Sequence, residues 1–296
     1  MRGPRDTSGM AQRGTRTAAR PKRSPPKAPA SRGTQADKQA DDRSHKTLWT
    51  RLGIIALLAT TAAITTLVLA GHSNSRAALD RRTDHEVSAL LAGIPQQGNT
   101  LGRPTAPVTL QFFGDLECLT TKNWVTKLLP AIIQDFVRTG IIKIQYLSLK
   151  TDTIHPQVFV NQQTAALAAG AQDRMWNFIE TFYHEQGKEY TPYVTESYLD
   201  GIARQTQGLN LAQWHHDRET GRRTEQVVTD DQTARALGFH DTPAFRIGRT
   251  GRPLKNFTGR TVFLEFAGFA QMKYPVSLIG TQDLRKAIEE LTSSRR

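Results

Sequence analysis

Residues 108–122 place the only cysteine of the 296-residue chain between a predicted strand and a predicted helix. Most residues from Val108 to Phe113 are apolar or β-branched, which indicates a strand. Gly114 and Asp115 then predict a turn. Cys118 follows at the first turn of the helix, where unpaired backbone N–H groups and the helix dipole favour a thiolate. The stretch therefore predicts a strand–helix unit with a thiol at its junction.

This stretch resembles the active-site segment of the DsbA-like, membrane-anchored thioredoxin-fold family. In that family a strand, a phenylalanine and an aspartate precede Cys-Pro-x-Cys at the start of a helix. Phe113, Asp115 and Cys118 match the pattern. Leu119 replaces the proline and Thr121 replaces the second cysteine. The resemblance implies a thioredoxin fold with an active-site cysteine, but the usual dithiol chemistry needs both sulfurs.

The amino-terminal part of the chain differs in composition from the remainder. Residues 1–51 contain thirteen Lys or Arg and four Asp or Glu, a net charge of +9, whereas the whole chain carries +12. Residues 1–47 have almost no large apolar side chains, so they predict a disordered basic cytoplasmic tail. We interpret this tail as attracted to anionic lipid rather than to nucleic acid, because no groove-reading element accompanies the charge.

An uncharged run from Leu52 to Ala70 predicts a transmembrane helix. Extended to residues 48–71, the segment is long enough to cross a bilayer core of about 30 Å. A secretory signal peptide is disfavoured because the basic region before the run is too long. Lys and Arg are denser before the run than after it, so the positive-inside rule places the N-terminus in the cytoplasm. The sequence thus predicts a single-pass membrane protein with an extracytoplasmic domain, and the family resemblance implies that the membrane is a bacterial cell membrane.

Beyond this run we expect a juxtamembrane stalk over residues 72–95 and one folded domain over residues 96–296. The Gly-Ile-Pro-Gln lead-in at 93–96 also resembles bacterial members of the family. The resemblance covers about Gly93 to Leu291. The fold class it implies is α/β, a thioredoxin fold with a central mixed sheet flanked by helices and an all-helical insertion.

The region after Cys118 predicts a long helix followed by a second strand. Apolar residues recur at helical spacing to about Arg138, and Pro130 is expected to kink the helix. Ile141 to Leu149 have the composition of a strand. Because a helix connects the two strands, we expect them to be parallel.

Residues 155–237 predict helices in succession. Pro156 opens an alanine-rich stretch, and two further helical segments are expected near Glu196 to Thr206 and Leu211 to Leu237. The segment resembles the helical insertion that distinguishes DsbA-like proteins from plain thioredoxin.

The chain then returns to strands. Thr242-Pro243 resembles the cis-proline loop that faces the active-site cysteine in the family. Ala244 to Ile247 and Leu254 to Thr258 predict an antiparallel hairpin, and Thr281 to Leu291 predict a closing amphipathic helix. For residues 262–277 we expect a loop or a short helix.

A single sulfur limits the chemistry that Cys118 can perform. One cysteine excludes an internal disulfide, yet it can form a mixed disulfide that another thiol must resolve. The Thr121 hydroxyl can donate a hydrogen bond to a thiolate. Lys122 and a protonated His240 would lower the thiol pKa, whereas Asp115 and Glu117 would raise it.

These considerations give a set of expected site residues, with the thiol at the surface of a cleft. The expected catalytic residues are Cys118, Thr121 and Pro243, the expected substrate-binding residues are Thr242 and Phe113, and the expected modulating residues are Asp115, Lys122 and His240. No cofactor-binding or metal-binding residue is predicted, because no phosphate loop, dinucleotide motif or zinc spacing occurs.

Two functions remain open on this basis. The first is a membrane-tethered, extracytoplasmic thiol-disulfide exchange protein that acts as a monothiol through Cys118. Its partners would be client proteins with thiols or disulfides, and a small thiol or redox partner for resolution. The alternative is a redox-inactive thioredoxin-fold module that binds extended peptides, or acts as a chaperone, through the cis-proline groove. No cofactor is expected for either function.

Overall fold

The computed structural model describes residues 57, 60–61, 81–265 and 273–293. The predicted basic tail and, apart from Leu57, Thr60 and Thr61, the predicted transmembrane segment lie outside these residues. Within the described part of the chain, no helix is long and apolar enough to cross a membrane.

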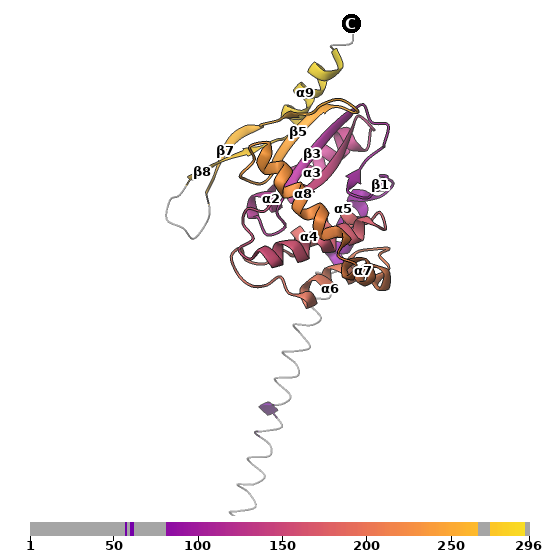
Figure 1. Ribbon diagram of the computed structural model, residues 1–296, viewed down its shortest axis with the longest axis vertical. Coiled ribbons are helices and arrows are strands. Elements are labelled where there is room, and N and C mark those ends of the chain that lie inside the picture. Colours follow the sequence, from indigo (N-terminus) through magenta and orange to yellow (C-terminus); the bar gives the residue numbers. More distant parts are fainter. Residues whose placement is uncertain (1–56, 58–59, 62–80, 266–272, 294–296) are drawn as a thin grey trace, which may run out of the picture. The chain divides into compact units, whose positions relative to one another are not determined.

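A six-stranded mixed sheet forms the centre of the domain (Figure 1), in the order β1-β2-β4-β3-β5-β6. Its two longest strands are β3, Val108–Gly114, and β4, Ile142–Ser148, which pair in parallel with Val108 opposite Ile142. On its other side β3 pairs antiparallel with β5, Ala244–Arg249. The short strands β1, Gln96–Gln97, β2, Thr100–Leu101, and β6, Lys255–Asn256, extend the edges. The predicted parallel crossover and antiparallel hairpin are both confirmed.

The central position of β3 explains its composition. Both neighbouring strands and the helices on either side exclude solvent, so six of its seven residues are buried. A strand covered on both faces is a nearly continuous apolar run rather than an alternating one. Phe112 lies in the aromatic core, where its ring centroid is 4.6 Å from that of Trp124 and 5.3 Å from that of Tyr146.

The helix predicted from Cys118 to Arg138 is present but irregular. It consists of α2, Leu119–Asn123, a π-helical turn η1, Trp124–Leu128, α3, Leu129–Ile132, and a second π-helical turn η2, Ile133–Val137. Pro130 lies in the first turn of α3, where its missing N–H removes one bond of the regular ladder. The irregularity expected at Pro130 therefore lies in α3, between the two wider π-helical turns.

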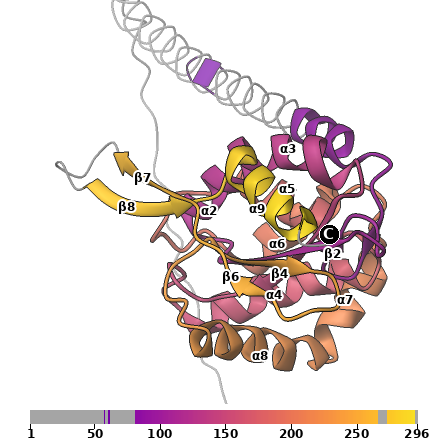
Figure 2. The same cartoon turned by 90° about the horizontal axis from the view of Figure 1, so that it is seen from above.

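The predicted helical insertion contains five helices between β4 and β5. They are α4, Pro156–Gly170, α5, Met175–Glu185, α6, Glu196–Gln205, α7, Leu211–Glu219, and α8, Arg222–Ala236. The single helix expected over 211–237 is divided at Gly221, whose φ of 68° is left-handed and ends the regular helix. Figure 2 shows α8 on one side of the sheet and α3 on the other.

Beyond β6 the structure contains a hairpin where the sequence predicted a loop or a short helix. Strands β7, Arg260–Glu265, and β8, Lys273–Leu278, pair antiparallel as a separate two-stranded sheet. The closing helix α9, Thr281–Ser293, follows as expected, with Leu284 and Ile288 buried. The indole N–H of Trp124 donates to the carbonyl of Ile279, which ties the segment before α9 to the core.

Part of the segment that was expected to be a stalk belongs to the folded domain. Residues 81–91 form a helix, and its Val87 and Leu91 are buried in the main hydrophobic core together with Ile94. The carbonyls of Leu90 and Ala92 also accept hydrogen bonds from the Arg138 guanidinium. The folded domain therefore includes residues 81–95, which the sequence had assigned to the stalk.

Candidate functional site

Cys118 lies where the sheet meets the helical layer. It is the N-cap residue of α2, with extended backbone angles, and follows the end of β3 by four residues. Its amide donates to the carbonyl of Asp115 over 3.1 Å, which closes the turn expected there. The sequence therefore places the thiol at the predicted strand–helix junction.

The Thr242-Pro243 loop lies directly against this thiol. The peptide bond between the two residues is cis, as the resemblance implied. The Sγ of Cys118 donates to the carbonyl oxygen of Thr242 over 3.4 Å. The hydroxyls of Thr242 and Thr151 are hydrogen-bonded at 2.7 Å, so the segment after β4 is joined to the cis-proline loop. Cys118, Thr242 and Pro243 are thus brought together as expected.

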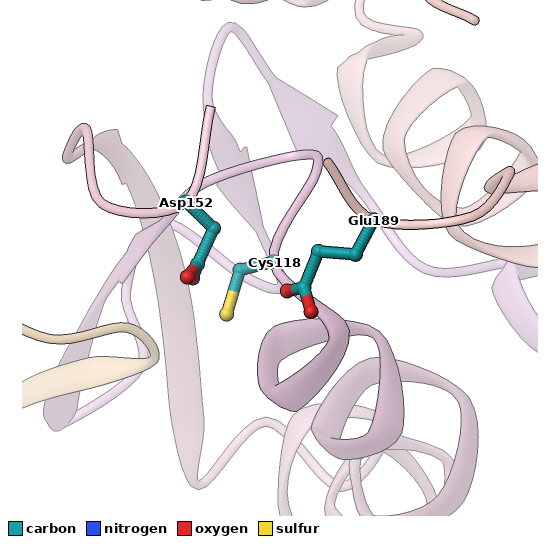
Figure 3. A group of neighbouring side chains, drawn as sticks. All are labelled: Cys118, Asp152 and Glu189. Atoms are coloured by element: carbon teal, nitrogen blue, oxygen red, sulfur yellow. The ribbon is translucent and has the colours of Figure 1, made fainter. Parts of the chain in front are cut away.

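The segment between α5 and α6 covers the thiol. The Glu189 carboxylate accepts the backbone N–H of Leu119 over 2.9 Å, and the Tyr190 hydroxyl donates to Asp152 over 3.0 Å. The Gln186 amide donates to the carbonyl of Cys118 over 3.3 Å. Figure 3 shows Asp152 and Glu189 on opposite sides of Cys118, each carried by an irregular segment. Only 3% of Cys118 is exposed.

The Asp115 carboxylate organises the loop after β4 rather than contacting the thiol. One oxygen accepts the backbone N–H groups of Thr151, Asp152 and Thr153, over 2.8, 3.0 and 3.0 Å. The other accepts the Thr153 hydroxyl and the N–H of Glu117. Burial raises the pKa of the Asp115 carboxyl, while these hydrogen bonds act against that shift. Asp115 therefore determines where Asp152 stands.

The surroundings of Cys118 favour the neutral thiol. Burial raises its pKa, and the charge and hydrogen bonding of Asp152 raise it further, while Thr121 and Thr242 act in the opposite direction. Burial also raises the pKa of the neighbouring Glu117 to about 7. The expectation of a thiol exposed in a cleft is therefore wrong. Desolvation and a nearby carboxylate have the largest effects on the pKa of the thiol at this position.

Thr121 occupies the position expected from its spacing. It stands three residues after Cys118 in α2, and its side chain is fully buried. Among the described residues its hydroxyl has no oxygen or nitrogen partner, and its neighbour is the Cys118 sulfur, whose pKa it lowers by hydrogen bonding. A thiolate at Cys118 would be a stronger acceptor for this hydroxyl than the neutral sulfur is.

The remaining expected residues have other surroundings. The Lys122 ammonium donates to the carbonyl of Gln186 over 3.2 Å, so it anchors the covering segment. His240 is exposed, and no hydrogen bond or ion pair joins it to Cys118 among the described residues. Phe113 is fully buried in a small apolar cluster, with its ring centroid 5.3 Å from that of Phe239. With no exposed surface, Phe113 serves in packing.

Two residues next to the thiol were not anticipated, Asp152 and Glu189. Together with Cys118 they offer three possible metal-ligand atoms within 4.8 Å of one another. Asp152 follows β4, whose carboxyl end lies beside that of β3, so the parallel pairing gave a signal for its position. Glu189 comes from a loop of the insertion, and nothing in the local pattern indicates its approach.

A thiol at a strand–helix junction, opposite a cis-Thr-Pro loop on a mixed sheet, defines the class of thioredoxin-fold proteins. Residues 96–254, more than half of the chain, match the family model described as Thioredoxin. The chain belongs to this family, and within it to the DsbA-like proteins.

Three proteins illustrate the similarity, and sequence identity is low in each case. The chain is 24% identical to the probable disulfide bond formation protein D of Bacillus anthracis over 151 residues, which cover 49% of this chain and 67% of that protein. It is 25% identical to disulfide bond formation protein D of Bacillus subtilis over 162 residues, covering 53% and 69%. The crystal structure of Wolbachia pipientis alpha-DsbA1 superimposes with a TM-score of 0.50 at 16% identity, over 69% of this chain and 93% of that one. This structural likeness supports the fold.

Proposed function

We propose that the protein is a thiol-disulfide exchange protein that acts as a monothiol through Cys118. The observation that carries this proposal is the hydrogen bond of 3.4 Å from Sγ to the carbonyl of Thr242, beside the cis peptide. Two relatives are named for disulfide bond formation, which supports the same class of reaction.

The exchange proceeds in two balanced steps. The Cys118 thiolate attacks one sulfur of a client disulfide, so a Cys118–client disulfide forms and the second client sulfur leaves as a thiolate. A thiol of the client, a small thiol or a partner protein then attacks the mixed disulfide and restores Cys118. Thr121, which replaces the resolving cysteine, donates a hydrogen bond to the thiolate and takes no part in electron transfer.

Access to the sulfur requires the covering segment to move. Glu189 and Tyr190 hold this segment through single hydrogen bonds to Leu119 and Asp152. A single hydrogen bond contributes only about 0.5–1.5 kcal/mol. Tyr190 is itself largely exposed and has a left-handed φ of 61°. A client that reaches Sγ next to the Thr242 carbonyl would displace these two contacts, while the hydrogen bonds of Gln186 and Lys122 hold the start of the segment in place.

The tether and the location belong to the same proposal. The uncharged run from Leu52 to Ala70 and the positive charge before it support a single-pass membrane protein with a cytoplasmic N-terminus. The domain that carries Cys118 then lies outside the cytoplasm, where disulfides persist. A protease-protection assay on intact cells tests this arrangement with an antibody to each end of the chain.

The exchange function is tested by trapping. The full-length chain is incubated with a peptide that contains a disulfide, and the products are analysed by non-reducing mass spectrometry. We expect a mixed disulfide at Cys118, absent in Cys118→Ser and reversed by added thiol. A native chain that forms no adduct, while the denatured chain reacts readily, would refute the proposal.

A second function is favoured by one observation, the burial of the thiol. Cys118 is 3% exposed and its pKa is raised, which suits a redox-inactive module that binds extended peptides through the cis-proline loop. This alternative expects Cys118→Ser to bind clients as well as the unchanged chain does. Loss of client binding in Cys118→Ser would exclude it.

A further inference from the structure

The side chains around Cys118 form a compact set of possible ligands for a cation. The Sγ of Cys118, a carboxylate oxygen of Asp152 and a carboxylate oxygen of Glu189 all lie within 4.8 Å of one another. Figure 3 shows the sulfur between the two carboxyl groups. The Thr242 carbonyl oxygen adds a further donor, 3.4 Å from Sγ. Three segments of the chain therefore bring side-chain ligand atoms to the same place, and a fourth brings a carbonyl oxygen next to the sulfur.

Among the described residues, no cationic side chain is paired with the two carboxylates at this place, those of Asp152 and Glu189. The partners of the two carboxylates are hydroxyl groups, a backbone N–H and, for Asp152, the Cys118 thiol. Lys122 bonds instead to the Gln186 carbonyl. Two half-buried carboxylates this close repel each other unless a proton or a metal ion lies between them.

A second observation concerns Thr121. Its side chain is fully buried, and its hydroxyl faces the Cys118 sulfur and has no oxygen or nitrogen partner among the described residues. Because Thr121 stands three residues after Cys118 in α2, the two side chains lie on the same face of the first turn. A negatively charged sulfur would be a strong acceptor for this hydroxyl, and a metal ion imposes that charge on a coordinating thiol.

We propose that Cys118, Asp152 and Glu189 form a binding site for a divalent metal ion of the Zn²⁺ type, with the Thr242 carbonyl next to it. A thiolate together with carboxylates suits Zn²⁺ and its probe Co²⁺. Ca²⁺ and Mg²⁺ prefer sites made entirely of oxygen ligands, so the sulfur selects against them.

Metal binding changes the protonation of the sulfur. The thiol loses its proton to the buffer as the S–metal bond forms, and the hydrogen bond to Thr242 is released. The Thr121 hydroxyl then donates to the coordinated sulfur. A metal-bound sulfur is no longer a free nucleophile, so bound metal and disulfide exchange compete for Cys118.

The test is a titration of the full-length chain with Co²⁺, followed by absorbance. We expect one Co²⁺ per chain, with a sulfur-to-cobalt charge-transfer band and the d–d bands of a low-symmetry site. The band disappears in Cys118→Ser. Asp152→Asn and Glu189→Gln each weaken binding by about tenfold or more, which is typical of the loss of a metal ligand or its orienting partner. Glu219→Gln, an exposed carboxylate on α7, serves as the matched control and leaves the affinity unchanged.

Two readouts beside absorbance complete the test. Zn²⁺ should displace Co²⁺, whereas Ca²⁺ in excess should not, and Zn²⁺ should protect Cys118 from alkylation. Absence of the sulfur band in the unchanged chain would overturn the proposal. So would Co²⁺ affinities in Asp152→Asn and Glu189→Gln that equal the affinity of the unchanged chain. The outcome is independent of the exchange function. A chain that exchanges disulfides but binds no Co²⁺ refutes only the metal site, and one that binds Co²⁺ but traps no client refutes only the exchange.

Discussion

The thiol of Cys118 donates a hydrogen bond to the carbonyl oxygen of Thr242, although 124 residues separate the two along the chain. The contact joins the start of α2 to the loop before β5. It exists because β3 and β5 are paired directly, with Phe113 opposite Ala244, so the ends of the two strands meet. The sheet register thus determines what the sulfur faces.

Asp152 is expected to restrain the reactivity of the thiol. Its charge and hydrogen bonding raise the pKa of Cys118, second only to burial. Asp152→Asn should lower that pKa and increase the rate of alkylation by iodoacetamide at a mildly alkaline pH several-fold. Asp241→Asn, an exposed carboxylate in the cis-proline loop, controls for a general charge effect. An unchanged rate in Asp152→Asn would show that burial alone limits the reaction.

A second cysteine should convert the site into a dithiol. Thr121 stands where the resolving cysteine of the family would be, and its side chain is buried one turn along from Cys118. Thr121→Cys should form a disulfide with Cys118 under mild oxidation, detected as the loss of two hydrogen masses and of both free thiols. Thr126→Cys, located further along the helix, is a control that should keep both thiols free. If both thiols also persist in the Thr121→Cys variant, the inferred geometry is contradicted.

Asp115 should be needed for the stability of the domain. Its two oxygens accept five hydrogen bonds. In Asp115→Asn one oxygen becomes an NH₂ group, which leaves either the N–H of Glu117 or three backbone N–H groups of the loop after β4 without their acceptor. We expect a loss of at least about 2 kcal/mol in the free energy of unfolding, measured by urea denaturation. Asp135→Asn, exposed on the helix after β3, should change it by less than about 0.5 kcal/mol.

Glu180 should make stability depend on pH. It lies fully buried in α5, neither oxygen has a partner among the described residues, and burial raises its pKa from 4.5 to about 8. The folded protein therefore binds this proton more tightly than the unfolded chain does. The stability that the protonated form contributes is fully present below the unfolded pKa and is lost as the pH rises through the folded pKa of about 8.

Between about pH 6 and about pH 8 the contribution of Glu180 to the free energy of unfolding should fall by about 2 kcal/mol, because one pKa unit corresponds to about 1.36 kcal/mol. Glu180→Gln carries no titrating proton, so its unfolding free energy should vary less with pH over this interval. Glu219→Gln should retain the slope of the unchanged chain. Parallel slopes in all three proteins, from urea melts at each pH, would show that burial does not raise the pKa of Glu180.

Much of the fold follows from local patterns. The apolar run of β3, the alanine-rich α4 and the amphipathic α9 carry their signals within their own residues, because burial imposes periodicity. The hairpin of β7 and β8 was missed, since it forms a separate two-stranded sheet rather than an extension of the central one. The division at Gly221 was missed because the residues on both sides favour helix, and only the left-handed backbone ends it.

The sequence by itself determined that a lone sulfur stands at a strand–helix junction and that a Thr-Pro pair follows the helical insertion. Both are local features of residue type and spacing. Only the tertiary structure decided that the sulfur is buried and that Asp152 and Glu189 flank it. The physical reason is that solvation and charge at an atom depend on every segment that approaches it, and these two carboxylates approach from loops 34 and 71 residues further along the chain.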